Sequence, residues 1–348
     1  MTRQTPYAAA DGLVRVYPAA EPSGAGLVWA HGGGFVAGDL DMPEADWVAR
    51  AFAAHGIPVV SIDYRLVGDG SGRFPAGSDD VLTAWTWTLD HADELGIDPG
   101  RLAIGGASAG ANLVTGAVLR LLGHAVDGGR GAGAGSVAGR VASASERIET
   151  EGGFDSLNHR NEGGFDGLNH RNEGGFDRLN HRAEEGGFDR LNHRMTAELH
   201  HRRPAGVFLA YPTLLAVQPA PGPELRAALD ADPDADRFRP DRVREMYETY
   251  LGGPVDDAPL VAVPGLAEPS DLAGFPPTVM VNGDTDELRV SGEAFAATLL
   301  AAGVPVELAL EPGTWHGHLN RPDEPGASAT VARVAAWIHR GFTAPTTT

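Results

Sequence analysis

Two residue patterns alternate along most of this chain of 348 residues, and the alternation limits its fold more than any other feature. Short runs rich in apolar and β-branched residues alternate with stretches that carry apolar residues three and four positions apart. The alternation runs from Gly12 to about His124 and resumes after about Pro204. Strands that alternate with helices pair in parallel and are covered by those helices. The sequence therefore predicts an α/β fold with a mostly parallel central sheet and helices on both faces.

The two patterns also place the expected elements. The strand-like runs are 13–17, 26–30, 58–63, 102–105, 207–211, 278–282 and 305–310. Helical spacing covers 45–55, 79–95, 109–122, 240–251, 291–302 and 329–340. The stretch 240–251 belongs to a Pro- and Asp-rich segment, 214–266, between two core strands. We interpret this segment as a small helical cap over a pocket.

Residues 125–204 interrupt the alternation. A Gly/Ala/Ser-rich stretch is followed by four copies of Gly-Gly-Phe-Asp-x-Leu-Asn-His-Arg, which end at Arg160, Arg171, Arg182 and Arg194. A glycine pair in each copy opposes a helix, and one Phe and one Leu bury too little area to offset the entropy of ordering the chain. We therefore expect a disordered low-complexity insertion within one domain formed by 1–124 and 205–348. Metal binding by the repeat histidines is an alternative, although no dense carboxylate or thiolate cluster accompanies them.

Composition excludes several kinds of chemistry. The chain has no cysteine and no lysine, so disulfides, thiolate metal sites, a cysteine nucleophile and Schiff-base or P-loop lysines are absent. A formal charge of -20 opposes binding to nucleic acid and to anionic membranes. The first ten residues lack a signal-peptide pattern, and no run approaches about 18 apolar residues. We expect a cytoplasmic protein without membrane insertion; the sequence predicts no oligomeric state.

The motif with the most specific context is Gly-Ala-Ser-Ala-Gly at 106–110, which follows an expected strand and opens an expected helix. A serine on such a sharp turn projects its hydroxyl above the sheet at a helix N-terminus, where developing negative charge is favoured. The flanking glycines allow strand and helix to approach each other. Ser108 is therefore the candidate nucleophile. The alternative is an ordinary glycine-rich turn.

A second motif, His-Gly-Gly-Gly-Phe at 31–35, follows the apolar strand 26–30. Glycines leave backbone N–H groups uncovered, and acyl transfer needs such donors to bind the oxyanion of its tetrahedral intermediate. Removing one donor typically costs about 3 to 4 kcal/mol of transition-state stabilisation. The expected donors are Gly33, Gly34 and Ala109, with Gly32 in reserve. The alternatives are a flexible turn or a phosphate loop, but no P-loop pattern accompanies the motif.

A serine nucleophile needs a base and an acid that orients the base. Histidine suits the first role near neutral pH, and the loop after the last expected strand offers His316 and His318. The loop after the strand 278–282 offers the acids Asp284, Asp286 and Glu287. The resulting chain order of serine, acid and histidine is typical of hydrolases built on this kind of sheet.

In combination these motifs resemble the bacterial hormone-sensitive-lipase-like esterases of the α/β-hydrolase fold, over most of the chain outside the insertion. Further landmarks are Asp-Tyr-Arg-Leu at 63–66, Gly-Ile-Asp-Pro at 96–99 with Arg101, Phe-Pro-Pro at 275–277 and Gly-Glu-Ala-Phe-Ala at 292–296. In the family's register Asp286 is the catalytic acid and His316 the base. The resemblance implies hydrolysis of acyl esters, usually short ones, without a metal or other cofactor. With 30 residues before His31, cover is expected mainly from 214–266.

The sequence therefore predicts a serine hydrolase that cleaves small carboxylic esters through an acyl-enzyme intermediate. The predicted site comprises Ser108, Asp286 and His316, with the oxyanion donors named above. An amidase or peptidase and an acyltransferase remain alternatives, because they share the same acyl-enzyme. A non-catalytic ligand-binding protein on a hydrolase scaffold is a further alternative from another class of function.

Overall fold

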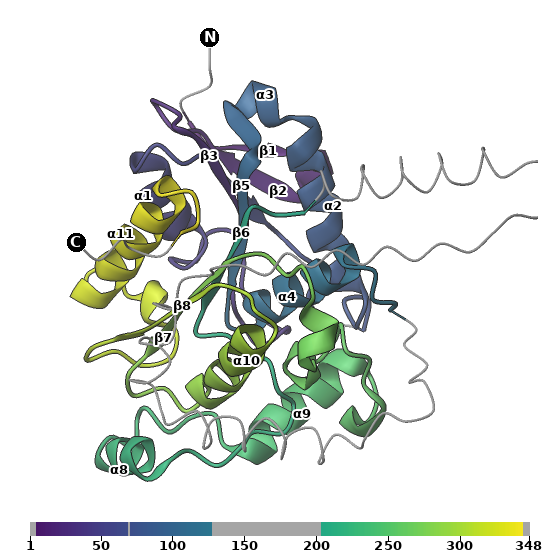
Figure 1. Cartoon of the computed structure of the whole chain (residues 1–348), viewed down its shortest axis with the longest axis vertical. Helices are drawn as coiled ribbons and strands as arrows, with labels where there is room; N and C mark the ends of the chain where they lie inside the picture. The colour runs from purple at the N-terminus through teal and green to yellow at the C-terminus, as the bar shows by residue number, and fades with distance from the viewer. Residues whose placement is uncertain (1–4, 69, 127–202, 344–348) are drawn as a thin grey trace, which may run out of the picture.

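The computed structural model describes residues 5–68, 70–126 and 203–343. These residues form an eight-stranded sheet in the order β1-β2-β4-β3-β5-β6-β7-β8 (Figure 1). The strands β3 to β8 pair in parallel, whereas β2 is antiparallel to both β1 and β4. The strands are β1 Tyr7–Ala9, β2 Val14–Tyr17, β3 Gly24–Ala30, β4 Val59–Ile62, β5 Ile97–Ala107, β6 Gly206–Ala210, β7 Thr278–Gly283 and β8 Val306–Glu311. The predicted α/β fold with a mostly parallel sheet is confirmed.

Helices cover both faces of this sheet (Figure 1). Helices α1 and α11 pack on one face, and α2, α4 and α10 pack on the other. The α-helices are α1 Asp46–Ala54, α2 Ala76–Asp90, α3 Ala92–Leu95, α4 Ala109–Leu121, α8 Pro223–Ala231, α9 Pro240–Leu251, α10 Arg289–Ala301 and α11 Pro325–His339. Single turns of 3-10 helix are η1 Ala10–Gly12, η3 Val255–Asp257, η4 Pro264–Leu266, η5 Pro269–Leu272 and η6 His318–Asn320.

Alternating side chains of the strands supply two separate hydrophobic cores. In β3, Leu27 and Trp29 pack with α1 and α11, whereas Val28 and Ala30 pack with α2 and α4. This follows from the two-residue period of a strand, and burial on both faces explains why the central strands read as continuous apolar runs. The core strands therefore lie close to the residue ranges that were predicted from the sequence.

Three elements differ from the sequence-based expectation. The expected helix 79–95 is divided into α2 and α3 at His91, whose Nδ1 lies 2.8 Å from the carbonyl oxygen of Trp87. The edge strand β1 was not predicted, because its three residues are too short to show a pattern. Helix α8 was also missed, although Leu225 and Leu229 carry helical spacing behind an N-terminal proline.

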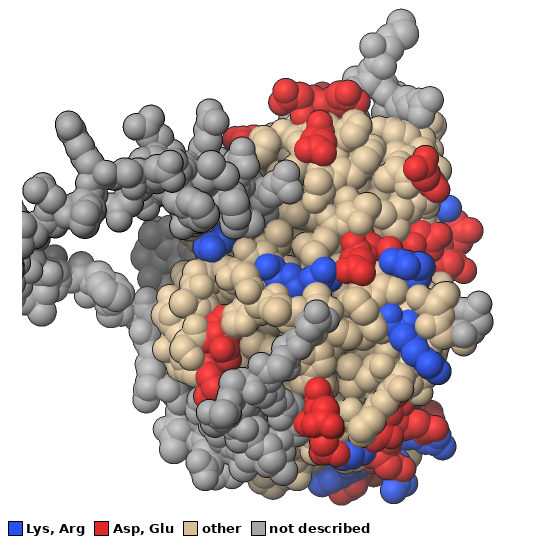
Figure 2. All heavy atoms as spheres, turned by 90° about the vertical axis from the view of Figure 1, so that its right-hand side faces the viewer, with Lys and Arg blue, Asp and Glu red and all other residues tan. Residues whose placement is uncertain are grey.

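The insertion predicted at 125–204 falls almost wholly outside the described residues, as do its repeats and their histidines. The segment 214–266, interpreted as a cap, contains α8 and α9, which lie together at the lower end of the molecule in Figure 1. None of the described helices combines the length and the apolar character needed to span a bilayer. On the face shown in Figure 2, acidic and basic side chains are interspersed over the described surface.

His318 joins the loop after β8 to helix α11. Its side chain is fully buried, its Nε2 lies 2.8 Å from Thr330 Oγ1, and its ring meets the edge of Tyr211 at 4.9 Å. Burial disfavours the charged imidazolium and lowers the pKa of His318 to about 4. The neutral imidazole of His318 is thus part of the packed core, at the edge of the sheet from which the loops extend.

We expect the burial of His318 to make the fold sensitive to acid. The pKa of about 4 in the folded state lies below the ordinary value of 6.5, so the stabilisation is complete above pH 6.5 and is lost as the pH falls toward 4. The difference in unfolding free energy between the wild type and His318→Gln should therefore shrink between pH 7 and pH 4.5. Urea denaturation at both pH values measures it, with the exposed His55→Gln as a matched histidine replacement. An equal difference at both pH values would contradict the expectation.

Candidate active site

Ser108 occupies the turn between β5 and α4 in a backbone conformation that is rare for a residue with a side chain. Its φ is 51° and its ψ is -116°, and it forms the N-cap of α4. The backbone around it leaves no room for side chains, since a Cβ at Gly106 would lie 2.5 Å from Gly110 C, and a Cβ at Gly110 would lie 2.2 Å from the carbonyl oxygen of His31. The glycines thus permit the strained turn that projects the hydroxyl from the end of the strand.

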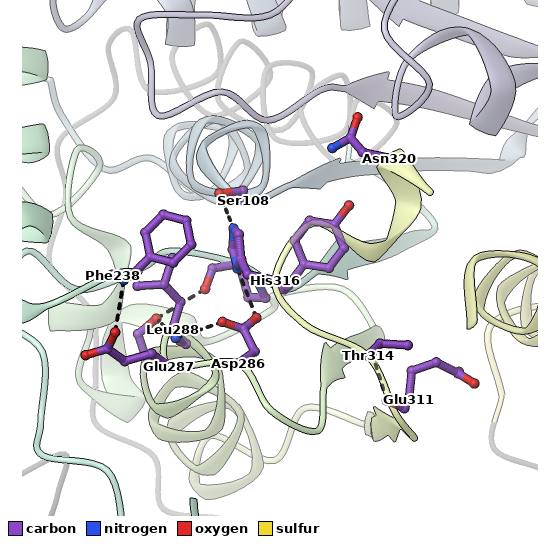
Figure 3. A network of polar contacts seen from close by, with 12 residues as sticks. Ser108, Phe238, Asp286, Glu287, Leu288, Glu311, Thr314, His316 and Asn320 are labelled. Carbon is purple, nitrogen blue, oxygen red and sulfur yellow. Dashed lines mark hydrogen bonds and ion pairs between the residues drawn. The ribbon is translucent and has the colours of Figure 1, made fainter. Parts of the chain in front are cut away.

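The side chains of His316 and Asp286 form a chain of polar contacts with the Ser108 hydroxyl (Figure 3). Ser108 Oγ lies 2.9 Å from His316 Nε2, and His316 Nδ1 lies 2.9 Å from Asp286 Oδ2. The second carboxylate oxygen of Asp286 accepts the N–H of Leu288 at 2.9 Å, and the whole side chain is buried. With Nδ1 donating to the carboxylate, Nε2 is the atom free to accept the hydroxyl proton, as acyl transfer by a serine requires. The structure therefore brings together all three side chains of the predicted triad.

The alternative acids have other partners. Asp284 accepts the backbone N–H groups of Gly313 at 2.8 Å and Thr314 at 3.1 Å, and so ties its own loop to the loop that carries His316. Glu287 accepts the N–H of Phe238 at 2.9 Å. Neither carboxylate has a hydrogen bond to the His316 imidazole, whose Nδ1 meets Asp286. The alternative base, His318, contacts Thr330 instead of Ser108.

The glycine loop after β3, residues 31–35, lies against the nucleophile. A Cβ placed on Gly32 would be 3.1 Å from Ser108 Cβ. Gly33 and Gly34 have φ of +122° and +61°, and a Cβ on Gly33 would be 1.8 Å from the carbonyl oxygen of Ala37. Only glycine fits the chain at this point. Among the described residues, the N–H groups of Gly33, Gly34 and Ala109 have no protein acceptor, so they are available to an oxyanion.

Gly32 differs from the other expected donors. Its N–H donates to the carboxylate of Glu44, so this group is already engaged. The reserve donor is thus not available in this arrangement. Gly33, Gly34 and Ala109 stay predicted oxyanion donors.

Three residues near the triad were not identified from the sequence. The ring of Tyr211 packs edge-on against the His316 ring, with the ring centroids 5.0 Å apart. Phe238, which belongs to the segment 214–266, packs against the same ring in the same way, with the centroids 4.4 Å apart. The third, Glu44, holds the glycine loop. Tyr211 ends an expected strand and Phe238 precedes an expected helix, and these positions are the only signal that could have indicated them. Glu44 belongs to no recognisable motif.

An acidic pair, Glu287 and Asp236 of the cap segment, joins the loop of Asp286 to this segment. Burial, followed by a hydrogen bond with Asp236, raises the pKa of Glu287 to about 7. Asp236 itself is paired with Arg226 at 2.8 Å. Glu287 is therefore neutral in much of the acidic range, and it holds the backbone of Phe238 against the imidazole of His316.

Comparison with known proteins identifies the family of the chain. A family model described as alpha/beta hydrolase fold matches residues 27–131 and 189–320. Carboxylesterase NlhH of Mycobacterium tuberculosis is 29% identical over 322 residues, which cover 89% of this chain and 73% of that protein. Ethyl acetate hydrolase of Pseudomonas putida is 44% identical over 106 residues, which cover 29% of this chain and 32% of that protein.

A solved structure described as bacterial heroin esterase has a TM-score of 0.60 and 26% sequence identity. The match covers 98% of this chain and 84% of the other chain. The family model accounts for more than half of the sequence, including the glycine loop, the serine turn and both loops that carry Asp286 and His316. The chain therefore belongs to the α/β-hydrolase family.

Proposed function

We propose that the protein is a serine esterase that hydrolyses small carboxylic esters, with a preference for short acyl chains, through an acyl-enzyme intermediate. The observation that carries the proposal is the unbroken chain of hydrogen bonds from Asp286 through His316 to Ser108 Oγ. The N–H groups of Gly33, Gly34 and Ala109, which have no acceptor among the described residues, support it further, and the glycine loop lies against Ser108 at Gly32. Relatives named for ester hydrolysis add the substrate class.

The first half of the reaction forms the acyl-enzyme. His316 Nε2 takes the hydroxyl proton while Ser108 Oγ attacks the ester carbonyl carbon. The carbonyl oxygen becomes an oxyanion that accepts hydrogen bonds from Gly33, Gly34 and Ala109, and Asp286 stabilises the imidazolium. The imidazolium then returns its proton to the leaving alcohol oxygen as the bond from carbon to that oxygen breaks.

The second half releases the acid. Water takes the place of the alcohol, and His316 Nε2 removes one of its protons as the water oxygen attacks the acyl carbon. The same donors hold the second oxyanion. When the bond to Ser108 Oγ breaks, the imidazolium protonates that oxygen, and the free enzyme is restored with one ester and one water converted into an alcohol and an acid.

A small substrate is supported by side chains around the triad. Phe238 packs on His316, and Met246 of α9 lies beside Gly34, so apolar side chains of the cap segment contact both the base and the glycine loop. The formal charge of -20 supports a small molecule over a nucleic acid as partner. A location in the cytoplasm stays a prediction.

Amide hydrolysis and acyl transfer use the same intermediate, so esters and matched amides should be assayed together.

We expect Ser108→Ala to abolish hydrolysis of p-nitrophenyl esters from acetate to decanoate. Loss of the nucleophile lowers kcat by about 10⁶-fold in serine hydrolases, since water cannot reproduce the attack. Ser61→Ala is the matched control, because Ser61 is also buried but lies within β4. Turnover by Ser108→Ala at the wild-type rate would refute a serine esterase. Turnover of amides but not esters by the wild type would favour an amidase.

The two aspartates of the β7 loop should respond differently to removal of their charge. Asp286→Asn leaves the shape intact but cannot accept the Nδ1 proton in the same way, so we expect kcat to fall by about 10⁴-fold. Asp284→Asn still accepts one of its two backbone N–H groups, so its kcat should fall by less than about 10-fold. Steady-state kinetics on one short ester compares them. A larger loss in Asp284→Asn would overturn the assignment of Asp286 as the acid.

A further inference from the structure

Glu44 is a buried acidic residue that the reaction described above does not use. It lies in the connection between the glycine loop and α1, and only 2% of its surface is exposed. One carboxylate oxygen accepts the N–H of Gly32, and the other accepts the hydroxyl of Tyr211 at 2.5 Å and the side-chain amide of Asn320 at 3.0 Å. Three donors thus meet a single carboxylate, which is the way a buried charge is compensated.

The direction of each bond is fixed by a second contact. Asn320 Oδ1 accepts the backbone N–H of Glu44 at 3.2 Å, so its amide nitrogen is the group that faces the carboxylate. The hydroxyl of Tyr211 accepts a backbone hydrogen bond from Leu319 and therefore donates its proton to Glu44. Burial and the charge of Glu44 raise the pKa of Tyr211 well above its usual value, so the phenol keeps that proton.

These bonds join loops that carry different parts of the catalytic machinery. Gly32 precedes the predicted oxyanion donors Gly33 and Gly34, and Asn320 follows His316 in the loop after β8. Tyr211 directly follows β6, and its ring packs edge-on against the His316 ring with the centroids 5.0 Å apart. Nothing within the sheet connects the glycine loop to the histidine loop directly, because β3 and β8 are separated by β5, β6 and β7.

The contact with Gly32 also sets the direction of the glycine loop. Glycine has no Cβ to limit its rotation, so consecutive glycines leave the peptide planes free to turn. Glu44 accepts the Gly32 N–H, and the hydroxyl of Tyr64 lies 2.9 Å from the carbonyl oxygen of His31 and 3.1 Å from that of Gly32, so the first planes are held from both sides. The carbonyl oxygen of Gly33 accepts the N–H groups of Val36 and Ala37, which fixes the plane that follows. The N–H groups of Gly33 and Gly34 are then oriented before the substrate arrives, which is what makes an oxyanion site effective.

We infer that Glu44 is a positioning residue for ester hydrolysis, which aligns the oxyanion donors with the Ser108–His316 pair by holding both loops on one buried carboxylate. The inference rests on the proposed function. Glu44 acts through Gly32, Tyr211 and Asn320, and it touches neither substrate nor the reacting atoms. Its effect should therefore be confined to the transition state, where the oxyanion exists.

The test uses Glu44→Gln in the full chain. The amide keeps the shape of the side chain but replaces one acceptor with a donor, so at least one of the three donors meets another donor. We expect kcat and kcat/KM on a short p-nitrophenyl ester to fall together by about 10- to 100-fold, with KM changed by less than about 3-fold. The inhibition constant of butylboronic acid, whose tetrahedral adduct mimics the oxyanion, should rise by the same factor.

Two further variants separate positioning from loss of folding. Asn320→Ala removes one partly exposed partner and should change the same two quantities by about 3- to 10-fold, in parallel. Asp80→Asn is the matched control, because Asp80 is a buried carboxylate that accepts a backbone N–H, from Arg65 at 2.8 Å, outside the site. It should lower the free energy of unfolding while kcat and the boronate constant stay at wild-type values.

The outcomes are distinct. A parallel loss of kcat and of boronate affinity in Glu44→Gln supports the inference. The rates are divided by the concentration of active serine, which is titrated with a phosphonate. Wild-type values for both quantities in Glu44→Gln would overturn it and leave the proposed esterase intact, and so would a lower kcat with unchanged boronate affinity. A wild type without ester turnover, although folded, would refute the proposed function and the inference with it.

Discussion

The close approach of α4 to the ends of β3 and β5 is the constraint on which the site depends. Gly110 lies against the carbonyl oxygens of Ala30 and His31, and Gly106 lies against Gly110, with no space for a Cβ at either position. This contact forces Ser108 into its strained conformation and puts the glycine loop beside its hydroxyl. Nucleophile and oxyanion donors are therefore consequences of one packing contact, and larger residues there would separate them.

Carboxylates hold the loops around this contact in place. Asp286 accepts the N–H of Leu288, Asp284 accepts two N–H groups of the histidine loop, and Glu44 accepts the N–H of Gly32. Each acid satisfies backbone donors that the ends of the strands would otherwise leave unpaired. Of these acids only Asp286 meets the imidazole, so similar side chains divide into one that orients the base and others that position loops.

Much of this arrangement could be predicted from the sequence. Helix α9 has the bounds that its spacing predicted, and the order of strand, serine turn and helix around Ser108 is present as expected. The division of 79–95 at His91 was not predicted, because the helical spacing of apolar residues continues past this residue although its φ of -112° and ψ of 12° end α2. Glu44 was missed for a different reason, since its partners Tyr211 and Asn320 lie 167 and 276 positions away.

The sequence by itself determined the class of sheet, the serine turn and the glycine loop, because each depends on spacing or backbone freedom within a few neighbouring residues. It also limited the acid and the base to a few side chains in two loops. The register of the family's motifs predicted Asp286 and His316 among them, and only the tertiary structure showed that these two side chains meet each other and Ser108. Ser108 and His316 are 208 positions apart, and the order and register of the strands between them set which side chains meet. The same register directs Asp284, His318 and Glu44 to other partners, since such distances depend on the whole packed sheet.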